Sequence, residues 1–425
     1  MVSRAPRFTL SNTVTYYITQ LHYLCLIVLV LILPYWGAWK LMRILPFAIF
    51  ILALFLGRFK IKDLLKNRVI LSLFVFIFFT YLSVFWSPSD ILFTQETQWG
   101  IDRFKWSFLL IPGIYLSTLT QKKIKNLFLI MALAPLGTAA VYYLNALGIT
   151  HIYSHLFVPG GESHIFVHYL VNNFFLLYSS IYFYLLSFES MAKKEYKKLS
   201  LYLLLTLIFF FSMLVDPITT SRLTVLAFFL IAIITPLFYI EKRTALLIFL
   251  ASVVFITIFI NKNENMQRGL STMNKAMQEN KYEGSWGHRL GFAIVGLSIY
   301  KEHPIIGRGI SDVRQRTILF ANENPEYFIG DAARHFHNEH INMLVQVGIV
   351  GYLLFAIFIF LLLKTPLNDP LMNKVKYTYT IAFLFMMLGE HYLTVFTTMT
   401  FLIFFISFLL VYEQLEKTEK EKIDA

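Results

Sequence analysis

The sequence contains few charged residues and almost no cysteine. Charged residues make up 15% of the 425 positions, whereas a soluble domain averages about a quarter. Hydrophobic residues make up 57%, and 43 residues are phenylalanine. This composition predicts an integral membrane protein. The single cysteine, Cys25, excludes an internal disulfide and a metal site built from cysteines, and its place in an apolar run indicates a core residue.

Neither a cleavable signal peptide nor a nucleic-acid-binding surface is indicated. The first apolar run, Tyr16 to Leu33, is long enough to span a membrane and is not followed by a small-residue cleavage pattern. The net charge of +12 comes mainly from lysines and arginines in short connections between apolar runs. In membrane proteins such connections mark the cytoplasmic side, so we expect no nucleic acid as a partner.

Apolar runs of about 20 residues, the length that crosses a bilayer as a helix, recur along the chain. The last run, 375–412, is too long for one span and is interrupted by Gly389-Glu390-His391, so we count it as two. The sequence therefore predicts an all-α polytopic membrane protein with about twelve transmembrane helices. The other runs are 16–34, 41–57, 69–86, 104–120, 127–148, 165–187, 199–215, 223–240, 244–260 and 341–363.

The basic connections predict the orientation of the spans. If the N-terminus is cytoplasmic, five basic connections fall on the cytoplasmic side and the C-terminus is cytoplasmic as well. They are 58–68, 122–125, 193–198, 242–243 and 364–376. The same order divides the chain into 1–260 with nine spans, an outer loop 261–340, 341–412 with three spans, and a cytoplasmic tail 413–425.

Within the outer loop, apolar residues recur at helical spacing from Trp286 to Lys301. We expect a helix here, with Ser285 as its N-cap and Pro304 ending it. Its apolar face favours packing on the membrane domain or at the interface.

Four blocks of distinctive residues lie in the second half of the chain, all on the expected outer side. They are Ser221-Arg222, Gly287-His288-Arg289, His303-Pro-Ile-Ile-Gly-Arg-Gly309, and His337-Asn338 followed after nine residues by Gly348-Ile-Val-Gly351. We expect the last two glycines to share one face of a helix, where a neighbouring helix approaches closely.

These blocks, in this order, resemble the signature of the O-antigen ligase and O-antigen polymerase superfamily. The family often has glycine where this chain has Leu223, and the first half of the chain matches only in its hydrophobic layout. The resemblance implies a GT-C-like membrane glycosyltransferase of the bacterial inner membrane, with 261–340 as a periplasmic loop carrying catalytic residues. An O-antigen ligase transfers a glycan from undecaprenyl pyrophosphate to the lipid A-core oligosaccharide by inversion and without a cofactor.

Arg222 and Arg289 are the expected pyrophosphate-binding residues. Guanidinium groups bind phosphate oxygens with paired hydrogen bonds. We expect both residues near helix N-termini, where the helix dipole also favours an anion. The alternative is that each arginine extends to the membrane interface or pairs with a neighbour, such as Asp216 for Arg222.

His337 is the candidate general base, because the ordinary pKa of histidine, about 6.5, suits acceptance of a proton from a sugar hydroxyl. The residues alone leave His335 and His340 as alternatives, and the family resemblance selects His337. Asn338 is interpreted either as the cap of the following helix or as a substrate contact.

Glu390 interrupts an apolar run and therefore needs a partner. It either orients the base or the acceptor, or marks an outer hairpin. Arg103, at the start of the expected fourth span, is interpreted as a membrane anchor rather than a phosphate contact.

A second cluster of histidines raises the question of a metal. It consists of His151, His155, Glu162, His164 and His168. These spacings do not match a helical zinc motif or a paired-cysteine site. His164 and His168 lie one helical turn apart, so a zinc or sugar contact is an alternative for these two. We interpret the histidines as lining the mouth of the site and predict no catalytic metal.

Three other functions stay open. An O-antigen polymerase and a protein O-oligosaccharyltransferase belong to the same superfamily. A transporter of lipid-linked sugars also needs cationic residues, but internal inverted repeats, which are typical of many transporters, are not evident.

Overall fold

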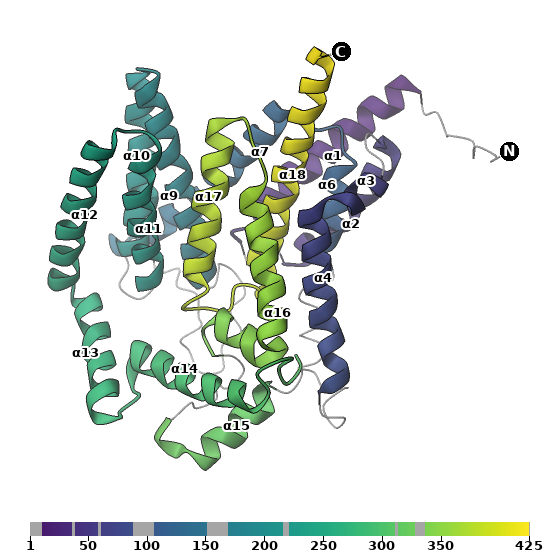
Figure 1. The fold of residues 1–425 in the computed structure, drawn as a ribbon. Coiled ribbons are helices and arrows are strands. Elements are labelled where there is room, and N and C mark those ends of the chain that lie inside the picture. The colour runs from purple at the N-terminus through teal and green to yellow at the C-terminus, as the bar shows by residue number, and fades with distance from the viewer. Residues whose placement is uncertain are drawn as a thin grey trace.

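The computed structural model describes residues 11–35, 39–57, 61–87, 106–150, 169–215, 221–310, 313–327 and 336–424. Within these ranges every regular element is a helix (Figure 1). The first part of the chain forms α1 (Asn12–Ile32), α2 (Trp39–Leu56), α3 (Ile61–Lys66), α4 (Arg68–Leu82), η2 (Ser83–Trp86), η4 (Ser107–Leu109), α6 (Leu110–Tyr115), α7 (Gln121–Leu133), α8 (Leu136–Ala146), α9 (Tyr169–Ala192) and α10 (Tyr196–Val215).

The second part carries all four sequence blocks. It forms α11 (Arg222–Ile234), η6 (Thr235–Phe238), α12 (Lys242–Lys262), α13 (Glu264–Glu279), α14 (Gly284–Glu302), α15 (Val313–Glu323), η7 (Pro325–Tyr327), α16 (Glu339–Lys364), α17 (Pro370–Met386) and α18 (Phe396–Asp424). The all-helical architecture expected from the apolar runs is therefore confirmed for the described residues.

Eight helical segments of the described chain are long and apolar enough to cross a membrane, and the protein is a multi-pass membrane protein. They are α1, α4 with η2, α7 with α8, α9, α10, α12, α16 and α18. Helices α2, α11 and α17 lie in three of the remaining expected spans but are shorter or more polar.

The expected span 104–120 differs most from the structure. Its described part contains only the short turn η4 and the six-residue helix α6. Pro112 and Gly113, both poor helix formers, lie inside α6. A Cβ atom on Gly113 would lie 3.2 Å from the backbone of Phe50, so this short helix packs closely on α2.

The core is centred on α18. In its most apolar stretch 94% of the residues are buried inside the protein, against 6% for α12, which stands at the edge of the bundle (Figure 1). The ring of Phe401 in α18 contacts Phe174 and Tyr178 of α9 at 5.2 and 4.6 Å. The hydroxyls of Tyr178 and Tyr379 each donate to the other's backbone carbonyl, at 3.1 and 2.9 Å. These contacts hold α9, α17 and α18 together, and with them the loop between α17 and α18.

The two ends of the bundle differ in chemistry. Helices α13, α14 and α15 lie together at one end, and the C-terminal end of α18 lies at the other (Figure 1). At that second end Lys125 pairs with Asp369, and Lys374 pairs with Glu189 at 3.1 Å. Three of the basic connections, around Lys125, 193–198 and 364–376, border one pocket there. The basic connections thus gather opposite the segment that we expect outside.

This arrangement predicts opposite exposure of Lys275 in α13 and Lys197 in α10. Because basic connections stay in the cytoplasm, a reporter fused at Lys197 should give a cytoplasmic signal and one at Lys275 an outer signal. Paired fusions to alkaline phosphatase and to a fluorescent protein that matures only in the cytoplasm measure this. The reverse pattern would show that the orientation is wrong.

Candidate functional site

Helix α14 begins earlier than the sequence pattern suggests. It starts at Gly284, after the N-cap Glu283, and ends at Glu302, shortly before Pro304. The expectation that Ser285 is the N-cap is therefore wrong, because Ser285 lies inside the first turn. Its hydroxyl and its backbone carbonyl instead accept hydrogen bonds from Arg289 Nη1, at 2.5 and 3.0 Å.

Helix α16 is broken at Gly348, its tenth residue. Its backbone has φ 63° and ψ −169°, a conformation essentially restricted to glycine. The break removes the helical hydrogen bonds that would join the carbonyls of Val345 and Gln346 to the N–H groups of Ile349 and Val350. These four backbone groups then need other partners.

The turn at residues 303–309 supplies these partners. The N–H groups of Arg308 and Gly309 donate to the carbonyls of Val345 and Gln346, at 2.8 and 2.9 Å. The N–H groups of Ile349 and Val350 donate to the carbonyls of Pro304 and Ile305, at 2.9 and 3.1 Å. We call this four-bond contact between the 303–309 turn and the break in α16 the clasp. It fixes the end of α14 against α16.

The clasp changes the interpretation of the glycine pair. We expected Gly348 and Gly351 to share a helical face for a neighbouring helix, but Gly348 lies at the break and a turn approaches it. A Cβ atom on Gly348 would lie 2.3 Å from the carbonyl oxygen of Ile305. Gly351 follows the break, where an added Cβ would lie 3.3 Å from the ring of Phe79 in α4.

His337 is held immediately before the first turn of α16. Its φ is +46°, a left-handed conformation that few residues other than glycine and asparagine adopt. The N–H of Phe336 donates to the side chain of Asn342 at 3.1 Å, and Asn338 caps the helix by accepting from the N–H of Ile341 at 3.1 Å. The ring of His337 lies 5.3 Å from that of Phe292 in α14. The backbone and the ring are thus both fixed.

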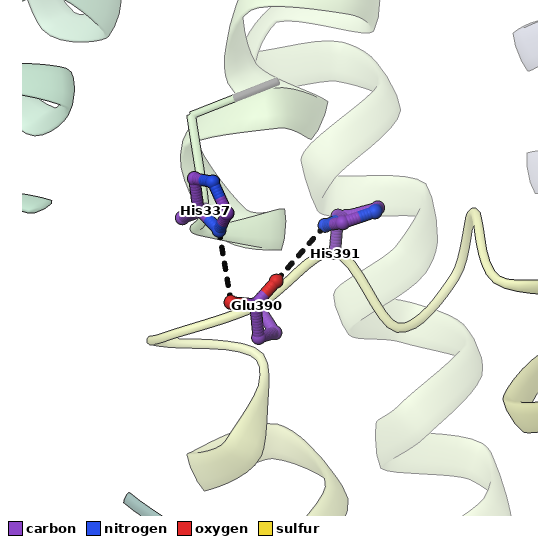
Figure 2. Close-up of side chains that lie close together, drawn as sticks. All are labelled: His337, Glu390 and His391. Atoms are coloured by element: carbon purple, nitrogen blue, oxygen red, sulfur yellow. Dashed lines mark hydrogen bonds and ion pairs between the residues drawn. The ribbon is translucent and has the colours of Figure 1, made fainter. Parts of the chain in front are cut away.

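Glu390 joins two histidines through its two carboxylate oxygens (Figure 2). Oε1 lies 2.8 Å from His337 Nδ1, and Oε2 lies 3.1 Å from His391 Nδ1. Glu390 is only 3% exposed. Burial alone raises the pKa of the Glu390 carboxyl, but the hydrogen bonds and charges of His337 and His391 outweigh burial and hold it well below its ordinary value. The carboxylate therefore stays ionised.

Arg289 contributes a third partner to this carboxylate. Its Nη2 lies 3.3 Å from Glu390 Oε1, and its Nε donates to the carbonyl of Gly389 at 3.2 Å. Together with the two bonds to Ser285, all three nitrogens of Arg289 donate to protein acceptors. Arg289 is the sixth residue of α14, beyond the first turn in which the helix dipole acts. The dipole argument made from the sequence therefore does not apply to Arg289.

Arg222 is the first residue of α11, as expected for a residue at a helix N-terminus. Its guanidinium carbon lies 6.0 Å from the ring centre of Trp286 in α14. Arg222 and Arg289 both line a cavity of about 400 Å³ between α11, α13, α14 and the α17–α18 loop. The remaining lining residues are mostly apolar: Ser221, Leu223, Leu226, Met273, Ser285, Trp286, Leu290, Ala293, Leu388 and Gly389. The cavity combines two cations with an apolar wall and borders the residue before Glu390.

Glu339 holds the loop that carries Glu390. It is 1% exposed, and its Oε2 accepts from the N–H of Leu393 at 3.1 Å. Its own N–H donates to the carbonyl of Met387 at 2.8 Å. The loop 387–395 is thus tied at both ends to the first turn of α16, which keeps Glu390 opposite His337.

His340, the second candidate base, has a structural role. Its Nε2 lies 3.1 Å from the carbonyl of Leu384 in α17, and its Nδ1 lies 3.1 Å from the hydroxyl of Tyr352. Both ring nitrogens therefore face groups of the bundle, one on α17 and one on α16 beyond the break at Gly348. The other sequence candidates lie outside the described residues: Arg103, His151, His155, Glu162, His164, His168, Asp216 and His335.

The sequence analysis did not single out His391 or Glu339 as site residues. A signal for each was present, because His391 follows Glu390 in the triplet that interrupts the last apolar run and Glu339 follows Asn338 in the fourth block. Neither signal shows which carboxylate or imidazole the side chain faces.

His337, Glu390 and His391 could also hold a metal ion, because their ligand atoms lie within 4.8 Å of one another. Two histidines and a carboxylate are a common ligand set. Here, however, each histidine directs Nδ1 at a carboxylate oxygen, and Arg289 brings a positive charge to the same carboxylate. This arrangement fits a hydrogen-bonded carboxylate better than a cation site.

Comparison with known families places these residues in context. Residues 202–356 match the family model described as O-antigen ligase. The match includes both arginines of the cavity, the clasp and His337, and it ends before Glu390. A search of curated proteins finds no match. The family match covers less than half of the chain, and over these residues the chain is similar to the O-antigen ligase family.

The clasp predicts that Gly348→Ala destabilises the protein strongly. The forbidden backbone conformation costs roughly 1–3 kcal/mol, and the Cβ overlap with Ile305 would also open some of the four hydrogen bonds. Gly57→Ala is the matched control, since Gly57 has φ +48° but no atom within 4 Å of an added Cβ. Denaturant unfolding in detergent measures both variants. Equal losses of unfolding free energy would show that the clasp contributes no stability.

Proposed function

Since the match over residues 202–356 supports assigning the chain to the O-antigen ligase family, we propose that the protein is an O-antigen ligase. It transfers a glycan from undecaprenyl pyrophosphate to the lipid A-core oligosaccharide, with inversion and without a metal. The observation that carries this proposal is the cavity that Arg222 and Arg289 line beside the His337–Glu390 pair.

The cavity suits the head of a lipid pyrophosphate. Arg222 offers a guanidinium at the N-terminus of α11, where the helix dipole favours an anion. Arg289 adds positive charge from α14, although its nitrogens also hold the loop of Glu390. The apolar wall formed by Leu226, Trp286 and Leu290 suits the first part of the lipid chain. The sugar then lies towards Gly389 and the histidines.

His337 acts as the base in this mechanism. With its proton on Nδ1 donated to Glu390, the lone pair of the imidazole is on Nε2. As the acceptor hydroxyl attacks the anomeric carbon, its proton passes to Nε2 and the new glycosidic bond forms. The bond from the anomeric carbon to the phosphate oxygen breaks, and undecaprenyl pyrophosphate leaves with the electron pair beside the arginines. Glu390 stabilises the imidazolium that results.

The cellular setting follows from the same proposal. The protein lies in the inner membrane of a bacterium, with residues 261–340 and the site on the periplasmic face and both termini in the cytoplasm. Helices α13–α15 and the basic connections lie at opposite ends of the bundle, which supports this orientation (Figure 1).

The lipopolysaccharide gel pattern of a deletion strain tests the reaction. Loss of the whole O-antigen ladder with build-up of the lipid-linked donor is expected for a ligase. A single capped unit instead of a ladder would identify an O-antigen polymerase. An unchanged pattern, together with unglycosylated secreted proteins, would identify a protein O-oligosaccharyltransferase, and purified protein that moves donor across vesicles without transfer would identify a transporter.

We expect Arg222→Ala and Arg289→Ala each to abolish transfer in protein that still inserts in the membrane. Lysine should restore only part of the activity at either position, because a single ammonium cannot reproduce a guanidinium fork. At position 289 it also cannot reach Ser285, Gly389 and Glu390 together. Transfer by purified variants measures this. Full activity of either lysine variant would show that charge alone suffices.

We expect His337→Ala to lose roughly 10²–10⁴ in turnover at neutral pH, the usual range for general base catalysis. His337→Asn should lose as much, although asparagine tolerates the left-handed backbone at this position. Donor binding should survive in both, since the arginines bind the pyrophosphate.

The controls are His335→Ala and His340→Ala, which should lose far less activity. The measurement is transfer by purified protein with lipid-linked donor and acceptor, with and without a chelator. Near-normal turnover of His337→Ala would show that His337 is not the general base. Loss of wild-type activity on chelation would point to a metal held by His337, Glu390 and His391.

A further inference from the structure

A second cavity, of about 520 Å³, lies between α9, α10, α11 and α12. Its lining is almost entirely apolar. Among the lining residues of α11, Phe228 and Phe229 are the closest in sequence to Arg222. The full lining is Tyr184, Leu203, Thr206, Leu207, Phe228, Phe229, Ala232, Ile233, Ile248, Ala251, Ser252 and Ile256. No charged residue is among them.

One stripe of α11 runs from the cavity of the arginines to this second cavity. Arg222 and Leu226 line the first cavity, and Phe229 and Ile233 line the second. Their spacings of four, three and four residues place these side chains on one face of the helix. From Arg222 to Ile233 the stripe is roughly 16 Å long, at about 1.5 Å per residue. This helix face is thus polar at the end of Arg222 and apolar at the end of Ile233.

Helix α12 closes the second cavity loosely. Only 6% of its most apolar stretch is buried inside the protein. The contact of Phe229 with Phe259, at 5.4 Å between ring centres, joins α11 and α12. Beyond it, Ile256, Ser252 and Ile248 line the cavity towards the other end of α12.

We propose that the second cavity binds the polyprenyl chain of the donor while Arg222 holds its pyrophosphate. This assignment rests on the proposed function, because the arginine cavity is taken as the site of the donor head. A lipid whose phosphate lies at Arg222 enters the second cavity along Leu226 and Phe229. A bulk phospholipid with its head elsewhere has no such link to the arginines.

The bilayer around the prenyl chain limits how much the second cavity can contribute to donor binding. A prenyl chain in the bilayer is already away from water, so entry into the cavity gains packing rather than hydrophobic transfer energy. The cavity therefore selects chain shape and length. Filling it should raise KM for a long-chain donor by roughly fivefold to thirtyfold, which corresponds to about 1–2 kcal/mol.

Ala251→Trp is the test variant, because Ala251 lines the cavity from the exposed helix α12 and is itself exposed. Leu250→Trp is the matched control, since Leu250 neighbours it, is 51% exposed and does not line the cavity. Ala232→Phe fills the same cavity from α11 and serves if the α12 variant fails to fold. Each purified variant is assayed with the same glycan on undecaprenyl and on farnesyl pyrophosphate.

The expected result is a raised KM of Ala251→Trp for the undecaprenyl donor only, with the farnesyl donor and Leu250→Trp unchanged. If Ala251→Trp and Ala232→Phe both keep the wild-type ratio of kcat/KM for the undecaprenyl donor to kcat/KM for the farnesyl donor, the second cavity does not bind the polyprenyl chain. The proposed function would be unaffected by that result. Absence of transfer from either donor by the wild type would instead overturn the proposed function.

Discussion

The buried carboxylate of Glu390 is the group on which the geometry of the site depends. A charge this far from water is costly unless it is paired and hydrogen-bonded. Its partners come from different segments: Arg289 from α14, His337 from the residue before the cap of α16, and His391 from its own loop. Each segment is therefore positioned by the same charge. Loss of the carboxylate would leave two imidazoles and a guanidinium without their common acceptor. The positions of the three segments therefore depend on one another.

The broken helix α16 makes this arrangement possible. A continuous helix would pair its backbone N–H and carbonyl groups with one another and leave none of them to bond the turn at the end of α14. At Gly348 the chain exchanges two internal hydrogen bonds for four bonds with the 303–309 turn. The turn ends the helix that carries Arg289, and α16 begins directly after His337. The clasp therefore limits how far the cation and the imidazole can move apart, although it lies away from both.

Part of this structure can be predicted from the sequence, namely the features written in local patterns. The helical layout follows from apolar runs, and the cap at Asn338 follows from its place before Ile341. The internal partners do not follow in the same way, because Glu390 lies 101 residues from Arg289 and 53 from His337. The break at Gly348 was missed because a glycine in an apolar helix usually indicates close helix packing. Its clasp consists of backbone groups, which leave no side-chain signature.

The two arginines occupy different positions, and this difference bears on how the reaction is arranged. Arg222 begins a helix and faces the cavity beside Trp286, whereas Arg289 lines the same cavity with its nitrogens directed at Ser285, Gly389 and Glu390. On the proposed function, one rigid side chain of α14 thus lies between the leaving pyrophosphate and the carboxylate that orients the base. Reacting groups gain most when their separation is fixed before the reaction begins. On this view Arg289 contributes to catalysis chiefly by fixing that separation. Arg222 contributes by stabilising the negative charge of the leaving pyrophosphate.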